Sequence, residues 1–378
     1  MSVGVDADRL RDLTLELVRV DSPTGETRAA AALYAQRLEE IGMEVEVQRD
    51  VFPATPIVIG RLRGSEPGPT VVLNGHLDTV PIPHAPPRLE NGAIHGRGAA
   101  DMKGACAAAA EAVRVFARTP FKGEVVIVAI GLHEAPGGRG EDLRHLLESG
   151  FRADMAVVCE LSDRDVVAVA HMGQATAEIT VSRPGMPTHE LQTPAGTPHP
   201  LLAAARVLEA IRRRNDELAA NEHPWVGAET YFIGELHGGD FYNRFQAACR
   251  IVGTRRWMPG NTLEEVEAEY RALLDRVADE TGCDIDLELK LVRDAYEIDV
   301  DHPLVQALRA AHREVTGRDL EPVGVKVVAD GALFAAAGIP TVYHGPVGSG
   351  AHADVELVQV DELVRAAEVY VALLRRLL

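Results

Sequence analysis

Imidazole and carboxylate side chains follow three apolar segments of the chain, at points where strands are expected to end. His76 and Asp78 come directly after the segment TVVLNG, and Glu160 closes the segment DMAVVCE. His133 and Glu134 follow the segment EVVIVAIG. Ligands gather at the carboxyl ends of strands in α/β sheets, and imidazole with carboxylate but no thiolate suits Zn²⁺ or a similar divalent ion. The pattern therefore predicts a metal-dependent site with a glutamate available as a base.

Two further candidates lie in glycine-rich segments. Asp101 lies in GRGAADMKG, before an alanine-rich helix, and His352 lies in HGPVGSGAHADVE, before the last helix. Asp101 has a simpler explanation as well, because it could merely cap its helix. The pair of His76 and Asp78 could also be a structural accident, because both residue types are common in turns. On an extended segment, however, the two residues of such a pair point the same way, so the carboxylate of Asp78 can orient the imidazole of His76.

The composition excludes several classes of protein. The 378 residues carry 38 Lys and Arg against 57 Asp and Glu, a formal charge of −19 that disfavours nucleic acid and anionic lipid as partners. The four cysteines form no Cys-x-x-Cys pair, so neither a zinc ribbon nor a disulfide framework is expected. Neither a signal peptide nor a membrane span is recognisable, which predicts a cytoplasmic location and no membrane partner.

The elements that must position these residues alternate between helix and strand. Continuous apolar runs between helices predict an α/β fold with a mostly parallel central sheet flanked by helices. After about His171 the order changes to strand, helix, strand, strand, helix, which predicts an inserted α+β domain. The expected division is 1–171 for the first part of a catalytic domain, 172–292 for the insert and 293–378 for the second part.

Five segments occur along the chain in the order GHLDTVP, GRGAADMKG, HEAPGGRG, VCELSD and GAHADVE. Together they resemble the co-catalytic zinc hydrolases, a family that includes acetylornithine deacetylase, succinyl-diaminopimelate desuccinylase, aminoacylase and carboxypeptidase G. The resemblance spans nearly the whole chain and implies hydrolysis of an amide bond in an N-acyl amino acid or small peptide. It implies a zinc cofactor, one or two ions per chain, for which Co²⁺ or Mn²⁺ could substitute. It also implies a homodimer, formed through the insert as a dimerisation or lid domain.

The resemblance also assigns roles to individual residues. His76 and Glu160 would bind the first metal, His352 the second, and Asp101 would bridge the two. Glu134 would be the general base toward a metal-bound water, with Asp78 orienting a metal-binding histidine. In the insert, His189 of GMPTHE would stabilise an oxyanion in the partner's active site. The substrate would be bound by Asn243 of GGDFYN, by Arg256 of GTRRWMPG as a clamp for its carboxylate, and by Gly345.

One departure from the family is serious. The second of two adjacent glutamates, a ligand of the second metal, is replaced by Ala135. The second metal is then weak or absent, or His133 supplies a replacement ligand. An isolated residue such as His189 or Arg256 is otherwise more often on the surface or in the packing. Two alternatives remain open: a dipeptidase or carboxypeptidase with the same machinery, and a catalytically silent homologue that binds a small carboxylate.

Overall fold

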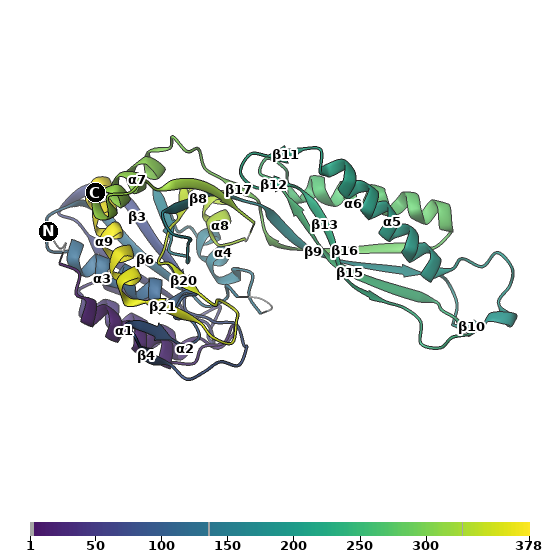
Figure 1. Ribbon diagram of the computed structural model, residues 1–378, viewed down its shortest axis with the longest axis horizontal. Helices are drawn as coiled ribbons and strands as arrows, with labels where there is room; N and C mark the ends of the chain where they lie inside the picture. Colours follow the sequence, from purple (N-terminus) through teal and green to yellow (C-terminus); the bar gives the residue numbers. More distant parts are fainter. Residues whose placement is uncertain (1–3, 135–136, 327) are drawn as a thin grey trace. The chain divides into compact units, whose positions relative to one another are not determined.

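The computed structural model describes residues 4–134, 137–326 and 328–378. These residues form two compact units, whose helices and strands are labelled in Figure 1. Unit 1 comprises Met1–Val169, Ile298–Val323 and Ala329–Leu378, and unit 2 comprises Ala170–Glu297 and Gly324–Val328.

The largest sheet has nine strands in the order β1-β2-β6-β3-β7-β19-β8-β17, with β18 paired to β8. The central strands β6, β3, β7 and β19 are parallel, and the strands on either side, β2 and β8, run antiparallel to them. The last six residues of β3 are all buried, which requires that both faces of the sheet are covered. The strands are β1 (Glu44–Gln48), β2 (Ile57–Arg63), β3 (Glu66–His76), β6 (Lys122–Ile130), β7 (Met155–Val158), β8 (Val166–His171), β17 (Tyr296–Glu297), β18 (Glu321–Val325) and β19 (Thr341–Tyr343).

Helices cover this sheet in two groups. One group packs around α3 and α9, which contact each other and β3, and the other consists of α4 and α8, of which α8 contacts β7 and β19. The alanine-rich α3 is buried over almost its whole length, because methyl side chains let it approach the sheet and α9 closely. The helices of unit 1 are α1 (Ala7–Arg19), α2 (Arg28–Glu40), α3 (Lys103–Phe116), α4 (Glu141–Glu148), α7 (Pro303–Thr316), α8 (Gly331–Ala336) and α9 (Val360–Leu377).

A small four-stranded sheet brings distant segments together beside the strand ends. Its order is β20-β21-β5-β4, with strands β4 (Arg88–Glu90), β5 (Ala93–His95), β20 (Gly348–Ser349) and β21 (Leu357–Gln359). The strand β5 leads into the turn that carries Asp101, and the loop between β20 and β21 carries His352. Pairing of β21 with β5 therefore joins these two candidate segments, which are about 250 residues apart in sequence.

Unit 2 is an α+β layer built on a four-stranded antiparallel sheet, in the order β13-β15-β9-β16. Alternate residues of β9 are buried, so one face of the sheet packs on α5 and α6 and the other does not. Its main elements are β9 (Gly173–Ser182), α5 (Pro200–Leu218), β13 (Thr230–His237), β15 (Ala248–Trp257), α6 (Leu263–Thr281) and β16 (Asp284–Arg293). Short pairs link β10 (Thr188–His189) with β14 (Arg244–Phe245), and β11 (Glu222–His223) with β12 (Gly227–Ala228); a single 3-10 turn, η1, spans Glu190–Gln192.

The predicted α/β class with parallel central strands is confirmed. Three features were not predicted: the strand β16, the small sheet beside the strand ends, and the antiparallel strands that extend the main sheet. Pairing of β16 with β9 along nearly its whole length defines it as a strand, although its sequence DIDLELKLVR places charged residues on the open face. Among the helices that the structure describes, none combines the length and apolar character needed to cross a membrane.

Candidate active site

The end of β3 carries a fully buried histidine and aspartate. His76 Nδ1 lies 2.9 Å from the backbone carbonyl oxygen of Asp78 and 3.4 Å from its Oδ1. The other carboxylate oxygen of Asp78 accepts hydrogen bonds from the backbone N–H groups of His133 at 3.1 Å and Glu134 at 2.8 Å. Asp78 therefore fixes the segment that follows β6 against the end of β3, in addition to contacting His76.

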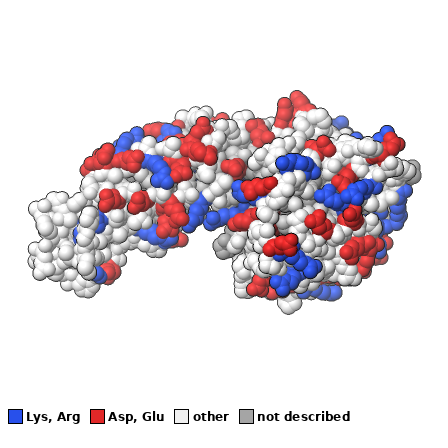
Figure 2. Space-filling model, turned by 180° about the vertical axis from the view of Figure 1, so that it is seen from behind, with Lys and Arg blue, Asp and Glu red and all other residues white. Residues whose placement is uncertain are grey.

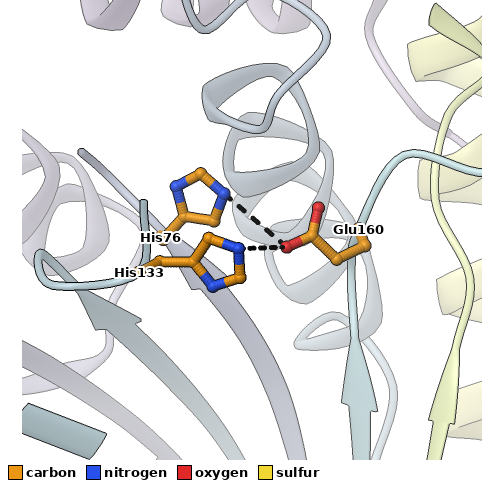
Figure 3. Close-up of side chains that lie close together, drawn as sticks. All are labelled: His76, His133 and Glu160. Atoms are coloured by element: carbon orange, nitrogen blue, oxygen red, sulfur yellow. Dashed lines mark ion pairs between the residues drawn. The ribbon is translucent and has the colours of Figure 1, made fainter. Parts of the chain in front are cut away.

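Two imidazoles face one carboxylate oxygen (Figure 3). The rings of His76 and His133 stack with their centroids 4.2 Å apart and their planes within 1° of parallel. Their Nε2 atoms lie 3.6 and 3.5 Å from Oε1 of Glu160, beyond hydrogen-bond range, and that oxygen is buried without a hydrogen-bond partner. Three potential donor atoms therefore converge on a common point, and they come from the ends of β3, β6 and β7.

A second group of side chains, Asp101, His352 and Glu134, adjoins the first group at His76. The Nε2 atom of His76 lies 3.2 Å from Oδ1 of Asp101. The other carboxylate oxygen of Asp101, Oδ2, lies 3.5 Å from Nε2 of His352. That nitrogen of His352 is also 3.1 Å from Glu134, which is buried. Asp101 does not cap the following helix, because the N-cap is Met102. His352 therefore contacts both Asp101 and Glu134.

A buried glutamate that the sequence did not single out holds these loops in place. Glu356 accepts hydrogen bonds from the backbone N–H groups of Gly98, Ala100 and Asp101, at 2.9–3.1 Å. It also pairs at 2.9 Å with the buried guanidinium of Arg97, which in turn donates to a carbonyl oxygen in the His352 loop. Nothing in the local pattern distinguished Glu356 from an ordinary residue preceding a short strand.

Burial of so many acids shifts their proton affinities. Burial raises the pKa of the Glu160 carboxyl to about 7, and burial also raises the pKa of Glu134. Burial alone would lower the pKa of His133, but the carboxylate of Asp330 raises it to about 9. The hydrogen bond to Asp101 raises the pKa of His352, also to about 9. In the absence of metal, protons on the imidazoles would balance the buried carboxylates, and a divalent cation would supply the same balance of charge.

The donor set fits a divalent metal. Donor atoms held about 2.0–2.2 Å from a tetrahedral ion lie roughly 3.3–3.6 Å from one another, and the contacts of Glu160 with His76 and His133 fall within that range. The buried, unpartnered oxygen of Glu160 is the atom that such an ion would satisfy. All the donors are nitrogen or oxygen, as is common for Zn²⁺ and related ions.

The remaining candidates lie in or beside other elements. In unit 2, the exposed His189 accepts the backbone N–H of Leu191 at Nδ1, and its Nε2 lies 3.1 Å from the side-chain amide of Asn243. Arg256 is on β15 and donates to the carbonyl oxygen of Lys326. Gly345 packs so closely on Glu160 that an added Cβ would lie 2.1 Å from its carbonyl oxygen. Position 345 therefore needs glycine for packing.

Ala135, the departure from the family pattern, lies outside the described residues. The neighbouring His133 is described, and it has a partner in another segment of the chain. The carboxylate of Asp330, which precedes α8, lies 2.7 Å from Nδ1 of His133 and was not anticipated. The segment VVADG that contains Asp330 has neither the glycine flanks nor the neighbouring histidines that marked the other candidates.

Residues 72–376 match the peptidase family M20/M25/M40. The chain is 30% identical to a succinyl-diaminopimelate desuccinylase of Thioalkalivibrio sulfidiphilus, over 97% of this chain and 98% of that protein. It is 26% identical to an N-formyl-4-amino-5-aminomethyl-2-methylpyrimidine deformylase of Bacillus subtilis, over 92% of this chain and 88% of that protein. These matches confirm the resemblance inferred from the motifs.

Solved structures show the same fold. The aminopeptidase PepT of Bacillus cereus superposes with a TM-score of 0.81 at 21% identity, covering 99% of each chain. YXEP of Bacillus subtilis, described as a dinuclear metal-binding peptidase, superposes with a TM-score of 0.76 at 15% identity, covering 97% of each chain. At these identities the superpositions establish the architecture.

The buried Glu356 generates a stability prediction. Glu356→Ala leaves Arg97 and three backbone N–H groups without their acceptor, so the free energy of unfolding should fall by about 3–5 kcal/mol. Chemical denaturation of the metal-free protein measures this change. Glu66→Ala, which removes an exposed pair with Lys122, is the matched control and should cost less than about 1 kcal/mol. Equal losses in the two variants would contradict the role given to Glu356.

Proposed function

The chain belongs to peptidase family M20/M25/M40 and is a metal-dependent amidohydrolase or peptidase, and we propose that its substrate is an N-acyl amino acid or small peptide with a free carboxylate. The observation that carries the proposal is a buried glutamate, Glu134, beside a cluster of metal-type donors at the ends of three parallel strands. The 30% identical relative is a desuccinylase, and the 26% identical relative is a deformylase, so both are named for removing an acyl group.

We assign the metal to the donors described above. His76, His133, Glu160, Asp101 and His352 would hold one or two ions. When bound, a divalent cation would polarise the amide carbonyl and acidify a nearby water molecule. Zinc is our choice because imidazole and carboxylate donors occur together, and Co²⁺ or Mn²⁺ are possible substitutes.

Glu134 is proposed as the general base. Its carboxylate takes a proton from the attacking water and passes it to the nitrogen of the departing amine, so the base returns to its starting state. The backbone N–H of Glu134 donates to Asp78, which holds this residue at the end of β6. Burial favours proton uptake by its carboxylate, as the raised pKa shows, and this suits a group that must gain and lose a proton in each cycle.

Unit 2 is proposed to form a homodimer. The end of unit 2 that carries β10 is almost free of charged side chains in the rear view (Figure 2). The exposed fraction of its large apolar side chains is high, at 80% for Met186, 86% for Leu191 and 89% for Tyr242. Exposed apolar patches of this kind are typical of protein interfaces. The strand β13 also lies at the edge of its sheet, with Phe232 and Leu236 exposed.

His189 is proposed to act in the partner's site. Its Nδ1 accepts the backbone N–H of Leu191, and its Nε2 lies 3.1 Å from the amide nitrogen of Asn243, so the ring is held beside a second N–H donor. An exposed imidazole next to an amide N–H is suited to stabilising an oxyanion. Arg256 is proposed to bind the substrate carboxylate, since a guanidinium can donate two parallel hydrogen bonds to it.

The proposed reaction is tested by a screen of N-acetyl, N-succinyl, N-formyl and N-benzoyl amino acids and of dipeptides, with Zn²⁺, Co²⁺ and Mn²⁺. We expect release of the free amino acid, loss of activity on chelation and recovery when metal is restored. Cleavage of dipeptides alone would favour the peptidase alternative. Binding of a carboxylate ligand without turnover, under every metal, would instead identify a silent homologue.

Glu134→Gln should lower turnover of the best substrate by at least about 10²–10⁴-fold, because an amide cannot accept the proton from water. Fold and metal content should be retained, which circular dichroism and metal analysis would check. The matched control is Glu148→Gln, at an exposed position on α4, and it should have normal turnover. Near-normal turnover in a metal-loaded Glu134→Gln protein would remove this residue from the mechanism.

The trans role of His189 is tested by mixing subunits. His189→Ala and Glu134→Gln homodimers should each be inactive or nearly so. In a mixed dimer, one site combines an intact Glu134 with the partner's intact His189, so activity should return in that site. The measurement is turnover by mixed dimers isolated with two different affinity tags. Mixed dimers that stay as inactive as their parents would show that His189 does not act across the interface.

A further inference from the structure

Each ring nitrogen of His133 faces a carboxylate. Its Nδ1 lies 2.7 Å from Oδ2 of Asp330, and its Nε2 lies 3.5 Å from Oε1 of Glu160. In Figure 3 the ring lies flat against that of His76, with Nε2 turned toward Glu160. The first contact is a strong hydrogen bond, whereas the second is too long for one. The ring is therefore anchored by Asp330 and presents its other nitrogen to the cluster of donors.

Asp330 is buried at the start of α8. Only 1% of its surface is exposed, and it immediately precedes α8. An aspartate at that position commonly caps a helix through its side chain, but Asp330 makes no such cap hydrogen bond. A buried carboxylate 2.7 Å from a ring nitrogen can fix the orientation of that imidazole.

The chemistry of imidazole connects this contact to metal binding. A neutral ring that donates its Nδ1 proton to a carboxylate keeps a lone pair on Nε2, which is the form that binds a metal. The carboxylate also raises the basicity of the ligand nitrogen. His76 is oriented in a comparable way, through the Asp78 carbonyl oxygen near its Nδ1. In their neutral forms with the proton on Nδ1, both stacked rings can therefore offer the lone pair of Nε2 to the same ion.

We propose that Asp330 is a positioning residue that makes His133 a ligand of the same metal as His76 and Glu160, giving this ion two nitrogen donors and one oxygen donor from the chain. The inference rests on the proposed metal-dependent function and assigns His133 to one metal position. His352 contacts Asp101 and Glu134 on the other side of the cluster, and His133 has no described contact with either Asp101 or His352. The replacement of the family glutamate by Ala135 is thus accompanied by an added donor beside His76.

Metal affinity tests this proposal without reference to turnover. Zn²⁺ dissociation constants would be measured by chelator competition, starting from metal-free protein, for wild type, Asp330→Ala, Asp330→Asn, His133→Ala and the double variant His133→Ala/Asp330→Ala. Asp330→Ala should weaken the tightest site by about 10–100-fold. Asp330→Asn keeps an acceptor oxygen and should weaken it less. Since Asp330 acts through His133, the double variant should bind no more weakly than His133→Ala.

The matched control is another histidine–aspartate pair in unit 1. Asp165 lies 3.1 Å from Nε2 of His312, and neither belongs to the candidate site. Asp165→Ala should leave Zn²⁺ affinity unchanged. Thermal unfolding of the metal-free proteins would show whether an Asp330 variant has simply lost its fold, and the absorption spectrum of bound Co²⁺ should change in the Asp330 and His133 variants only.

Three outcomes would overturn the inference: wild-type affinity in folded Asp330→Ala, wild-type affinity in folded His133→Ala, or additive losses in the double variant. Each is distinct from failure of the proposed function. If wild-type protein bound no divalent metal, the metal-dependent function itself would fail. A different set of results would reject only the role of Asp330. In that case the wild-type protein would bind metal, the Glu134→Gln variant would lose turnover, and the Asp330→Ala variant would keep full metal affinity.

Discussion

The arrangement of the site depends on one electrostatic constraint, which is that several acids are buried together at the carboxyl edge of a parallel sheet. Asp78, Asp101, Glu134 and Glu160 cannot all be ionised in so small a space without compensating charge. The chain provides imidazoles and backbone N–H groups as compensating partners, and a bound divalent cation would add to them. The same arrangement that makes the acids costly to bury would make them strong metal ligands and would suit Glu134 to the proposed exchange of protons.

The scaffold meets this constraint with carboxylates that bind the backbone. Asp78 accepts two N–H groups from the segment after β6, and Glu356 accepts three from the turn before Asp101. Each carboxylate joins segments that are distant in sequence, so the donors on those segments are held in a fixed relation. The small sheet that contains β5 and β21 serves the same purpose, since it ties the His352 loop to the Asp101 turn.

Unit 2 is distinguished by large apolar side chains on its surface. Its sheet is covered by helices on one face, and it exposes large apolar side chains around β10 and along the edge strand β13. These features suit contact with a second copy of the chain better than a role in the core. A site that needs His189 from a partner would be complete only in the dimer, which would couple activity to assembly.

The sequence by itself determined the fold class and most of the site, because apolar runs mark buried strands and because His76, Asp101, Glu134 and Glu160 lie at the ends of such runs or in glycine-flanked turns. What only the tertiary structure decided was the set of contacts between distant segments. The contact of Asp330 with His133 spans 197 positions, and that of Glu356 with Arg97 spans 259. Periodicity and local motifs carry no information about such pairings, since they arise when helices and strands pack.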